Sequence, residues 1–271
     1  MIGNESVKKA VVPLALAAVV VILAMMAAAP ALAVDNYAWV AKGPSGAEGR
    51  YLVCSSSQPG VVYAGTNGGV YKTSDYGDNW SYSGIRFRGI DALRGSSGCN
   101  LGLLAGASGD LFQSLDGGST WNIIAPLGGE ITAVLVTNSP ACTVYAGTNN
   151  GVLNSLNRSG LPGVTIKALS VDSNNNVYAA TEDNGIYKTT NDGLSWEQKN
   201  NGLPDVTIFS LKIDGSNRIF AGTLGGGVFR STSGGDTWTQ QISGLPEFAG
   251  ISEFYFAYSL AKDTDGNLYA G

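Results

Sequence analysis

The side chains that could carry chemistry in this sequence are acidic residues and arginines in short segments between β-rich runs. The candidates are Arg50, Arg86, Arg88, Glu130, Glu182, Asp183 and Glu253, with Phe254 as an aromatic neighbour. Two carboxylates roughly 5 to 9.5 Å apart can hydrolyse a glycosidic bond, and planar guanidinium groups bind carboxylates in a bidentate manner. These residue types therefore allow either a hydrolytic site or a binding site. A solvated loop surface is the alternative for each residue taken alone.

Composition excludes several other kinds of site. The chain has 271 residues, no histidine and a formal net charge of −5, which excludes hydrolases of the Ser-His type and argues against a nucleic-acid partner. We expect no cofactor and no metal, because Cys54, Cys99 and Cys142 follow the repeat period instead of the spacing of metal ligands. A bridge between Cys99 and Cys142 is one reading. The alternative interpretation is that all three cysteines are small apolar residues of the core.

A turn unit recurs along the chain, and its cleanest copy is Ser-Leu-Asp-Gly-Gly-Ser-Thr-Trp at 114–121. The Asp can accept hydrogen bonds from backbone N–H groups, while Gly adopts positive φ. Such residues stabilise a tight turn between two strands. We therefore expect a structural role for Asp75, Trp80, Ser114, Asp116, Gly118, Trp121, Asn191, Trp196 and Trp238.

Two further phrases establish the period. Val-Tyr-Ala-Gly-Thr and its variants have their central small residue at Gly65, Gly106, Gly147, Ala180, Gly222 and Gly271, and Gly-Leu-Pro begins at 160, 202 and 244. A recurrence at about forty residues indicates a repeat architecture. Each period holds four β-rich runs separated by Asp, Asn, Gly or Pro, as in a blade of an all-β propeller.

The repeat predicts five complete four-stranded blades, at about 50–84, 88–125, 130–157, 163–199 and 206–242. A sixth begins at Ile251 and stops after its second strand, so we expect the natural propeller to be longer, with six or seven blades. The third unit lacks the Trp of the turn, which predicts a worn outer edge. Residues 37–41 resemble an outer strand, which would close the ring by pairing with the last blade.

The turn frame S-x-D-x-G-x-T-W resembles the Asp-box, or BNR, repeat. This repeat occurs in sialidases, xyloglucanase-type glycosidases, sortilin-type receptors and photosystem II assembly-factor propellers, so the resemblance implies the fold and leaves the activity open. The Arg-Ile-Pro segment of sialidases is absent, and xyloglucanase-type enzymes use two propellers. The resemblance therefore favours a binding or scaffold module with a protein or glycan partner. A propeller glycoside hydrolase is the alternative.

The N-terminal segment resembles a targeting sequence. Lys8 and Lys9 precede a long apolar run that ends in Ala-Leu-Ala at 31–33, as in a signal peptide. We expect residues 1–33 to be a signal peptide, or else an uncleaved membrane anchor, and residues 34–271 to form the propeller. Either reading places the propeller outside the cytoplasm, secreted, periplasmic or at the cell surface.

The blade topology separates the candidate residues from the repeated turns. First-to-second and third-to-fourth turns share one face, whereas second-to-third and interblade loops share the other. The Asp-box turns belong to the first face and the candidate residues to the second. A longer interblade segment at 247–256 adds acidic and aromatic residues to this second face, although its aromatic side chains could instead pack between blades. We expect any ligand to bind on the second face.

Overall fold

The computed structural model describes residues 43–44, 48–55, 57–85, 89–95, 99–138, 142–155, 161–205, 207–243, 245, 255–262 and 267–271. All regular structure in these ranges is β-strand, with no helix. Among these residues there is accordingly no helix that could cross a membrane. The expected leader at 1–33 and the expected closing strand at 37–41 lie outside the described residues.

Four four-stranded antiparallel sheets and one five-stranded sheet follow one another along the described part of the chain, and in each of them four consecutive strands pair in sequence order. Blade 1 comprises β1 (Gly49–Cys54), β2 (Val62–Thr66), β3 (Gly69–Thr73) and β4 (Ser81–Tyr82). Blade 2 comprises β5 (Ala92–Gly95), β6 (Leu103–Ala107), β7 (Asp110–Ser114) and β8 (Asn122–Pro126). Blade 3 comprises β9 (Ile131–Val136), β10 (Val144–Thr148), β11 (Gly151–Asn154) and β12 (Leu161–Pro162).

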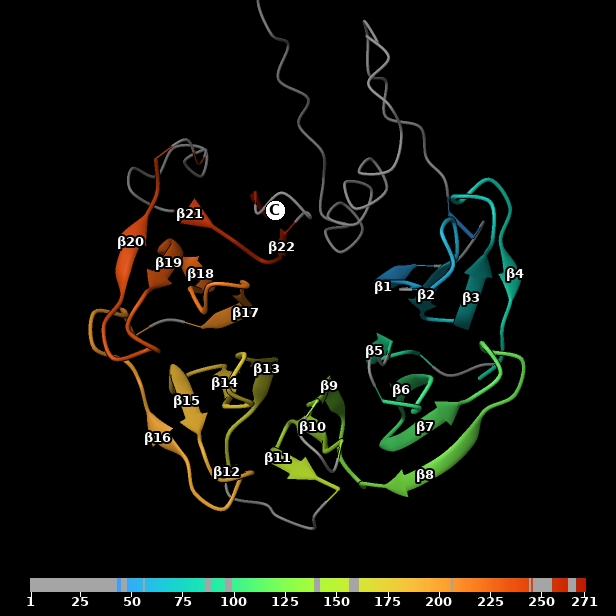
Figure 1. Cartoon of the computed structure of the whole chain (residues 1–271), viewed down its shortest axis with the longest axis horizontal. Coiled ribbons are helices and arrows are strands. Elements are labelled where there is room, and N and C mark those ends of the chain that lie inside the picture. Colours follow the sequence, from blue (N-terminus) through green and yellow to red (C-terminus); the bar gives the residue numbers. More distant parts are fainter. Residues whose placement is uncertain are drawn as a thin grey trace, which may run out of the picture.

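Blade 4 comprises β13 (Ile166–Val171), β14 (Val177–Thr181), β15 (Ile186–Thr189) and β16 (Glu197–Gln198). Blade 5 comprises β17 (Ile208–Ile213), β18 (Ile219–Gly225), β19 (Gly227–Ser231) and β20 (Thr239–Gln241), and β21 (Tyr255–Phe256) also pairs with β18. A two-stranded sheet of β22 (Leu260–Lys262) and β23 (Leu268–Ala270) begins a sixth blade. The sheets are arranged around a central opening, with the first strand of each innermost (Figure 1). The chain is therefore an all-β propeller, as predicted.

The third blade extends further than the sequence predicted. Its fourth strand, β12, pairs Leu161 with Val152 and Pro162 with Gly151, so the blade ends at 162 and not at 157. The pairing requires only backbone groups. Proline has no N–H group, and an edge strand tolerates it where that group would point away from the sheet and pair with no other strand. With two residues, β12 is as long as β4 and β16, so strand length does not mark this edge as worn.

Successive blades pack through a close contact between a glycine of the second strand and an isoleucine of the next blade. A Cβ atom added to the glycine would lie within 2.6 to 2.7 Å of the isoleucine Cγ2 in three consecutive pairs, Gly65–Ile90, Gly106–Ile131 and Gly147–Ile166. All three isoleucines are fully buried. The small residue at the centre of the repeated phrase thus lets neighbouring sheets approach closely.

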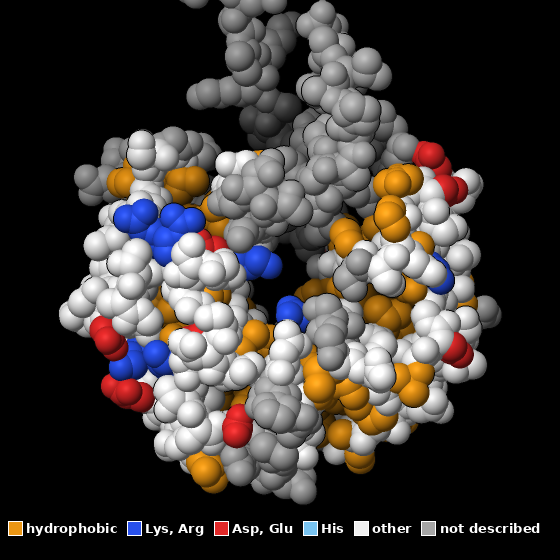
Figure 2. All heavy atoms as spheres, in the orientation of Figure 1, with side chains coloured by type: hydrophobic (Ala, Val, Ile, Leu, Met, Phe, Trp, Pro, Cys, Tyr) orange, Lys and Arg blue, Asp and Glu red, His pale blue; other side chains and the backbone are white. Residues whose placement is uncertain are grey.

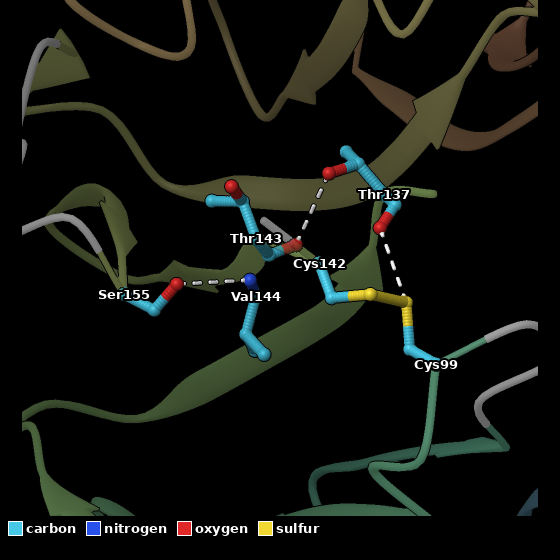
Figure 3. The surroundings of a disulfide bond; sticks show 6 residues. All are labelled: Cys99, Thr137, Cys142, Thr143, Val144 and Ser155. Carbon is cyan, nitrogen blue, oxygen red and sulfur yellow. Dashed lines mark hydrogen bonds between the residues drawn. A yellow bond between two sulfur atoms is a disulfide. The ribbon is translucent and has the colours of Figure 1, made fainter. Parts of the chain in front are cut away.

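A disulfide also joins blades 2 and 3. Cys99 precedes β6 and Cys142 precedes β10, with their Cα atoms 6.1 Å apart. The bridge lies beside the paired Thr137 and Thr143 segments of blade 3 (Figure 3), where the Thr137 hydroxyl donates to the Thr143 carbonyl at 3.4 Å. Cys54, at the end of β1, is an exposed free thiol. Of the two readings of the sequence, the interblade bridge is therefore the one found.

Candidate ligand-binding site at the channel mouth

The innermost strand of four blades contains a bulge at the same register position. In blade 1, Gly49 pairs with Thr66 and Tyr51 with Gly65, which leaves Arg50 as the extra residue. The same irregularity leaves out Thr132 in blade 3, Lys167 in blade 4 and Phe209 in blade 5. Bulges redirect a side chain without ending the strand. Here they redirect one side chain per blade.

Two other blades place a residue at the equivalent position without a complete bulge. In blade 2, Ala92 pairs with Gly106, and the preceding Asp91 donates its N–H to the Gly106 carbonyl at 2.9 Å. In the partial sixth blade, Ser259 and Gly271 exchange backbone hydrogen bonds of 3.0 and 3.1 Å. Tyr258 therefore corresponds to Arg50 and Asp91.

These six positions line one cavity of about 260 Å³, together with Tyr51 and Glu130. We name it the mouth site, comprising Arg50, Tyr51, Asp91, Glu130, Thr132, Lys167, Phe209 and Tyr258. Its residues lie at or just before the start of the innermost strands. This is the end of the channel that faces away from the Asp-box turns, because those turns follow the opposite ends of the sheets.

Two ion pairs involve charged residues of the mouth site, and the distances within them differ. The Arg50 Nη1 atom lies 4.0 Å from an Asp91 carboxylate oxygen, and the Arg50 side chain is 44% exposed. The other Asp91 oxygen accepts the Ser108 N–H at 3.3 Å. Lys167 and Glu182 are 2.8 Å apart, and the hydrogen bond from Lys167 holds the pKa of Glu182 below its usual value. Burial, reinforced by the Asp91 charge, raises the pKa of Tyr51.

An aromatic wall completes the mouth site. The rings of Phe209 and Tyr258 lie 4.7 Å apart and tilted, and Phe256 stacks on Tyr258 at 5.4 Å with nearly parallel planes. Beside them, the Thr132 hydroxyl is buried and has no hydrogen-bond partner in the described part of the chain. The arrangement offers apolar ring faces and both signs of charge to a bound group.

The predicted site residues are only partly brought together. Arg50 and Glu130 line the mouth site, and Glu182 reaches it through Lys167, whereas the exposed Asp183 is not among the lining residues. Arg86, Arg88, Glu253 and Phe254 lie outside the described residues. Sequence reasoning missed Tyr51, Asp91, Thr132, Lys167, Phe209 and Tyr258. Aligned on the central small residue, the repeats place Asp91 and Thr132 fifteen residues before it, as Arg50 is, and Lys167, Phe209 and Tyr258 thirteen residues before it.

The Asp-box turns lie between the third and fourth strands of blades 1, 2, 4 and 5. In blade 2, the Asp116 carboxylate accepts hydrogen bonds of 2.8 Å from the Ser114 hydroxyl and from the Thr120 N–H. The Ser114 oxygen accepts the Gly118 N–H at 2.8 Å. Hydrogen bonds from Thr120 lower the pKa of Asp116 to about 2. In these contacts the Asp116 carboxylate accepts hydrogen bonds from residues of its own turn.

The boxes of blades 2 and 5 also bind to the preceding blade. The Tyr63 hydroxyl of blade 1 donates to the Gly117 carbonyl of the blade 2 box at 3.1 Å, and Tyr178 of blade 4 donates to Gly234 of blade 5 at 3.2 Å. The indole of Trp121 donates to the Ser83 carbonyl at 2.6 Å, and Trp238 donates to the Lys199 carbonyl at 2.8 Å. These contacts favour a structural role for the box residues.

The fold defines the chain as a β-propeller of four-stranded antiparallel blades. The structure resembles a GH74 xyloglucanase from Xanthomonas campestris with a TM-score of 0.64 and 17% identity, over 78% of this chain and 40% of that one. It resembles YCF48 bound to a D1 peptide with a TM-score of 0.56 and 13% identity, over 79% and 71%. PorZ, a surface component of the type-IX secretion system of Porphyromonas gingivalis, matches with a TM-score of 0.60 and 17% identity, over 82% and 37%.

These likenesses concern the fold alone, since the sequences differ widely. The chain spans 31% of the length of each of the first three structures that it matches, and 40% of the fourth. No protein-family model and no curated protein matches the sequence. The matched propellers include both enzymes and a peptide-bound propeller, so the family of this chain is unassigned.

Proposed function

We propose that this chain is an extracytoplasmic propeller module that binds a protein partner through the mouth site. The observation that carries the proposal is the convergence of one side chain from each of six blades, at equivalent register positions, on one cavity. Four of these side chains are set out of the strand ladder by a bulge. These four residues are therefore left out of the strand pairing, while their side chains line the cavity.

The size of the cavity favours an anchoring group over a whole small ligand. Pockets that enclose drug-sized ligands span roughly 300 to 1,000 Å³, and the mouth site measures about 260 Å³. It has room for one side chain, one chain terminus or one sugar ring. A larger partner would insert such a group and rest on the surrounding loops, as in an interface with a central hot spot.

The charges favour a protein partner. Arg50 keeps most of its N–H donors free, because its one ion pair in the described structure is at 4.0 Å and its side chain is 44% exposed. The exposed Glu130 lines the same cavity. An arginine and a carboxylate beside two aromatic rings can receive a polypeptide group through charge pairing and packing together. The peptide-bound YCF48 propeller supplies a structural analogy.

A location outside the cytoplasm is supported by the Cys99–Cys142 bridge, because disulfides persist mainly in oxidising compartments. Matched propellers described as extracellular domains or surface components point in the same direction. The targeting-like N-terminal segment agrees with both. A membrane would enter only through an uncleaved anchor in that segment.

The test is selection of a displayed peptide library on the immobilised mature chain. We expect enriched peptides whose binding weakens as ionic strength rises and is lost in Arg50→Glu and Phe209→Ala. Asp236→Asn, which alters an exposed Asp-box residue paired with Lys199, is the matched control and keeps binding. Peptides that bind all three variants equally would place the site elsewhere and refute the proposal.

A glycoside hydrolase is the second candidate, favoured by one observation. Asp91 and Glu130 line the same cavity as Phe209 and Tyr258, and sugar rings stack on aromatic faces. Release of reducing sugar from a polysaccharide panel, abolished by Glu130→Gln, would favour this function. Glycan-array binding without release would instead indicate a glycan-binding module.

A further inference from the structure

A cavity lies in the joint between blades 2 and 3, where their two sheets pack together. It measures about 270 Å³, and its described lining comes from β7, β8, β10 and β11 and the residues next to them. None of this lining is charged, and its apolar part includes Leu111, Ile124, Ala125, Val144, Ala146 and Leu153. We name it the joint cavity. On the face drawn in Figure 2, hydrophobic side chains gather where blades 2 and 3 meet.

The corresponding space between blades 1 and 2 is filled by the indole of Trp121. This ring packs against the buried cluster that joins the two blades, and its N–H donates to the Ser83 carbonyl at 2.6 Å. It lies so close to the backbone of Gly84 that a Cβ atom added there would be 2.5 Å from Trp121 Cδ1. The box tryptophan of blade 2 therefore closes the joint with blade 1.

The two joints correspond residue by residue. The cluster against which Trp121 packs includes Val70, Leu103, Ala105 and Phe112. The residues 41 positions later line the joint cavity, namely Leu111, Val144, Ala146 and Leu153. The strand registers agree, since Ala105 pairs with Phe112 and Ala146 with Leu153. Ile124 and Ala125, which also line the cavity, stand 41 positions after Ser83 and Gly84. The joint cavity is therefore the counterpart of the space that Trp121 fills.

Blade 3 has no tryptophan to place in this joint, because the sequence has none between Trp121 and Trp196. Trp196 packs against the cluster that joins blades 3 and 4, and Trp238 belongs to the cluster that joins blades 4 and 5. The joints before blades 2, 4 and 5 thus each hold an indole, whereas the joint before blade 3 holds a cavity. An apolar cavity of about 150 Å³ already binds benzene, so the joint cavity has room for an indole ring.

The outer strand beside the joint cavity offers an open edge. β8 has five residues, whereas β4, β12 and β16 have two each and β20 has three. Short or charged edge strands protect a sheet from pairing with other chains, but β8 has no charged residue, and its outer edge pairs with no other strand among the described residues. Ile123 and Ile124 on this strand are 53% and 44% exposed. A strand edge beside a side-chain pocket is the arrangement that adds a peptide strand to a sheet.

We propose that the joint between blades 2 and 3 binds an extended segment of a partner polypeptide, which pairs with the edge of β8 and inserts a tryptophan side chain into the joint cavity. The inserted ring takes the role that Trp121 has between blades 1 and 2. Ala125 carries the methyl group that Gly84 lacks, so the bound ring lies further from the backbone there than Trp121 does. The joint cavity shares no described lining residue with the mouth site. This surface therefore does not rest on the function proposed above.

The first test selects a displayed peptide library on a chain whose mouth site is disabled by Arg50→Glu and Phe209→Ala. We expect enriched peptides that contain a tryptophan. Ile124→Glu in the same chain should weaken their binding at least about tenfold, because the ring would desolvate the new charge. Leu194→Glu, which changes a 63% exposed leucine of the blade 4 turn, is the matched control and keeps binding. Enriched peptides without tryptophan, or equal binding to Ile124→Glu, would overturn the proposal.

Methyl NMR locates the bound ring without a variant. An enriched peptide and N-acetyltryptophanamide should both shift the methyl signals of Leu111, Val144 and Leu153 in a saturable manner, and shifts confined to other residues would overturn the proposal. Strand pairing uses the N–H groups of alternate residues, so N-methylation of one alternate set of peptide positions should lower the affinity at least about tenfold, and of the other set should not. Equal affinities of the two N-methylated peptides would refute pairing with β8. Binding of N-acetyltryptophanamide with no peptide selected would refute the polypeptide partner.

Discussion

Removal of the Cys99–Cys142 bridge should cost a large part of the stability of this propeller. The cysteines are 43 residues apart in sequence, and the loop-entropy model assigns a cross-link of that length about 4 kcal/mol at 25 °C. For a domain of about 150 to 250 residues, each kcal/mol lowers the Tm by roughly 2 to 4 °C. Cys99→Ser/Cys142→Ser should therefore lower the Tm by about 8 to 16 °C.

The assay is urea unfolding of the oxidised wild type, the double variant and the wild type in reducing agent, followed by tryptophan fluorescence. Cys54→Ser is the control, because Cys54 is exposed and unpaired and surface substitutions usually change the unfolding free energy by within about 0.5 kcal/mol. Thiol titration of the denatured, unreduced chain should find one free thiol. The reduced wild type should unfold at the midpoint of the double variant.

Three outcomes would refute this reasoning. Three free thiols in the unreduced chain would show that the bridge does not form. A loss of less than about 1 kcal/mol in the double variant would show that the closed loop gives no entropic stabilisation. A loss as large in Cys54→Ser would show that removal of a thiol, and not of the bridge, destabilises the chain.

Three further predictions concern the contacts within and between blades. Tyr178→Phe should reduce the unfolding free energy by about 1 to 2 kcal/mol, measured in urea, because it removes the hydrogen bond to Gly234 from a buried side chain. Asp116→Asn should fold at neutral pH but flatten the acid-unfolding curve: the depressed pKa of Asp116 contributes stability that is present above about pH 4 and is lost as the pH falls toward about 2. Lys167→Met should return the pKa of Glu182 toward its usual value in an NMR titration, and an unshifted Glu182 would show that their ion pair is not formed in solution.

The fold could be predicted because the same turn residues and β-rich runs recur along the chain. An Asp or Asn after a hydroxyl residue fixes the turn at Asp116 and again at Asn191, whose amide oxygen accepts the Ser195 N–H at 3.0 Å. The end of blade 3 could not be predicted in this way, since β12 pairs through backbone groups alone. Pro162 is not a residue type that predicts a strand, although it pairs with Gly151 in β12.

The candidate site was harder to predict, because bulges leave little trace in sequence. Arg50 and Glu130 could be selected as charged loop residues, and both line the mouth site. Thr132 and Phe209 could not, since a hydroxyl and an aromatic ring inside a β-rich run indicate ordinary strand positions. Only the pairing register shows that they stand outside the ladder.

The six strand-end residues of the mouth site have a consequence for how the proposed binding site could change its specificity. Four of the six mouth residues stand in bulges and the other two precede their strands, so a substitution at these positions leaves the turns, the interblade glycine contacts and the disulfide untouched. The six positions hold six different residue types, Arg50, Asp91, Thr132, Lys167, Phe209 and Tyr258, on nearly the same backbone. The proposed binding surface can thus diversify one blade at a time on a constant scaffold, much as loop positions vary on an antibody domain.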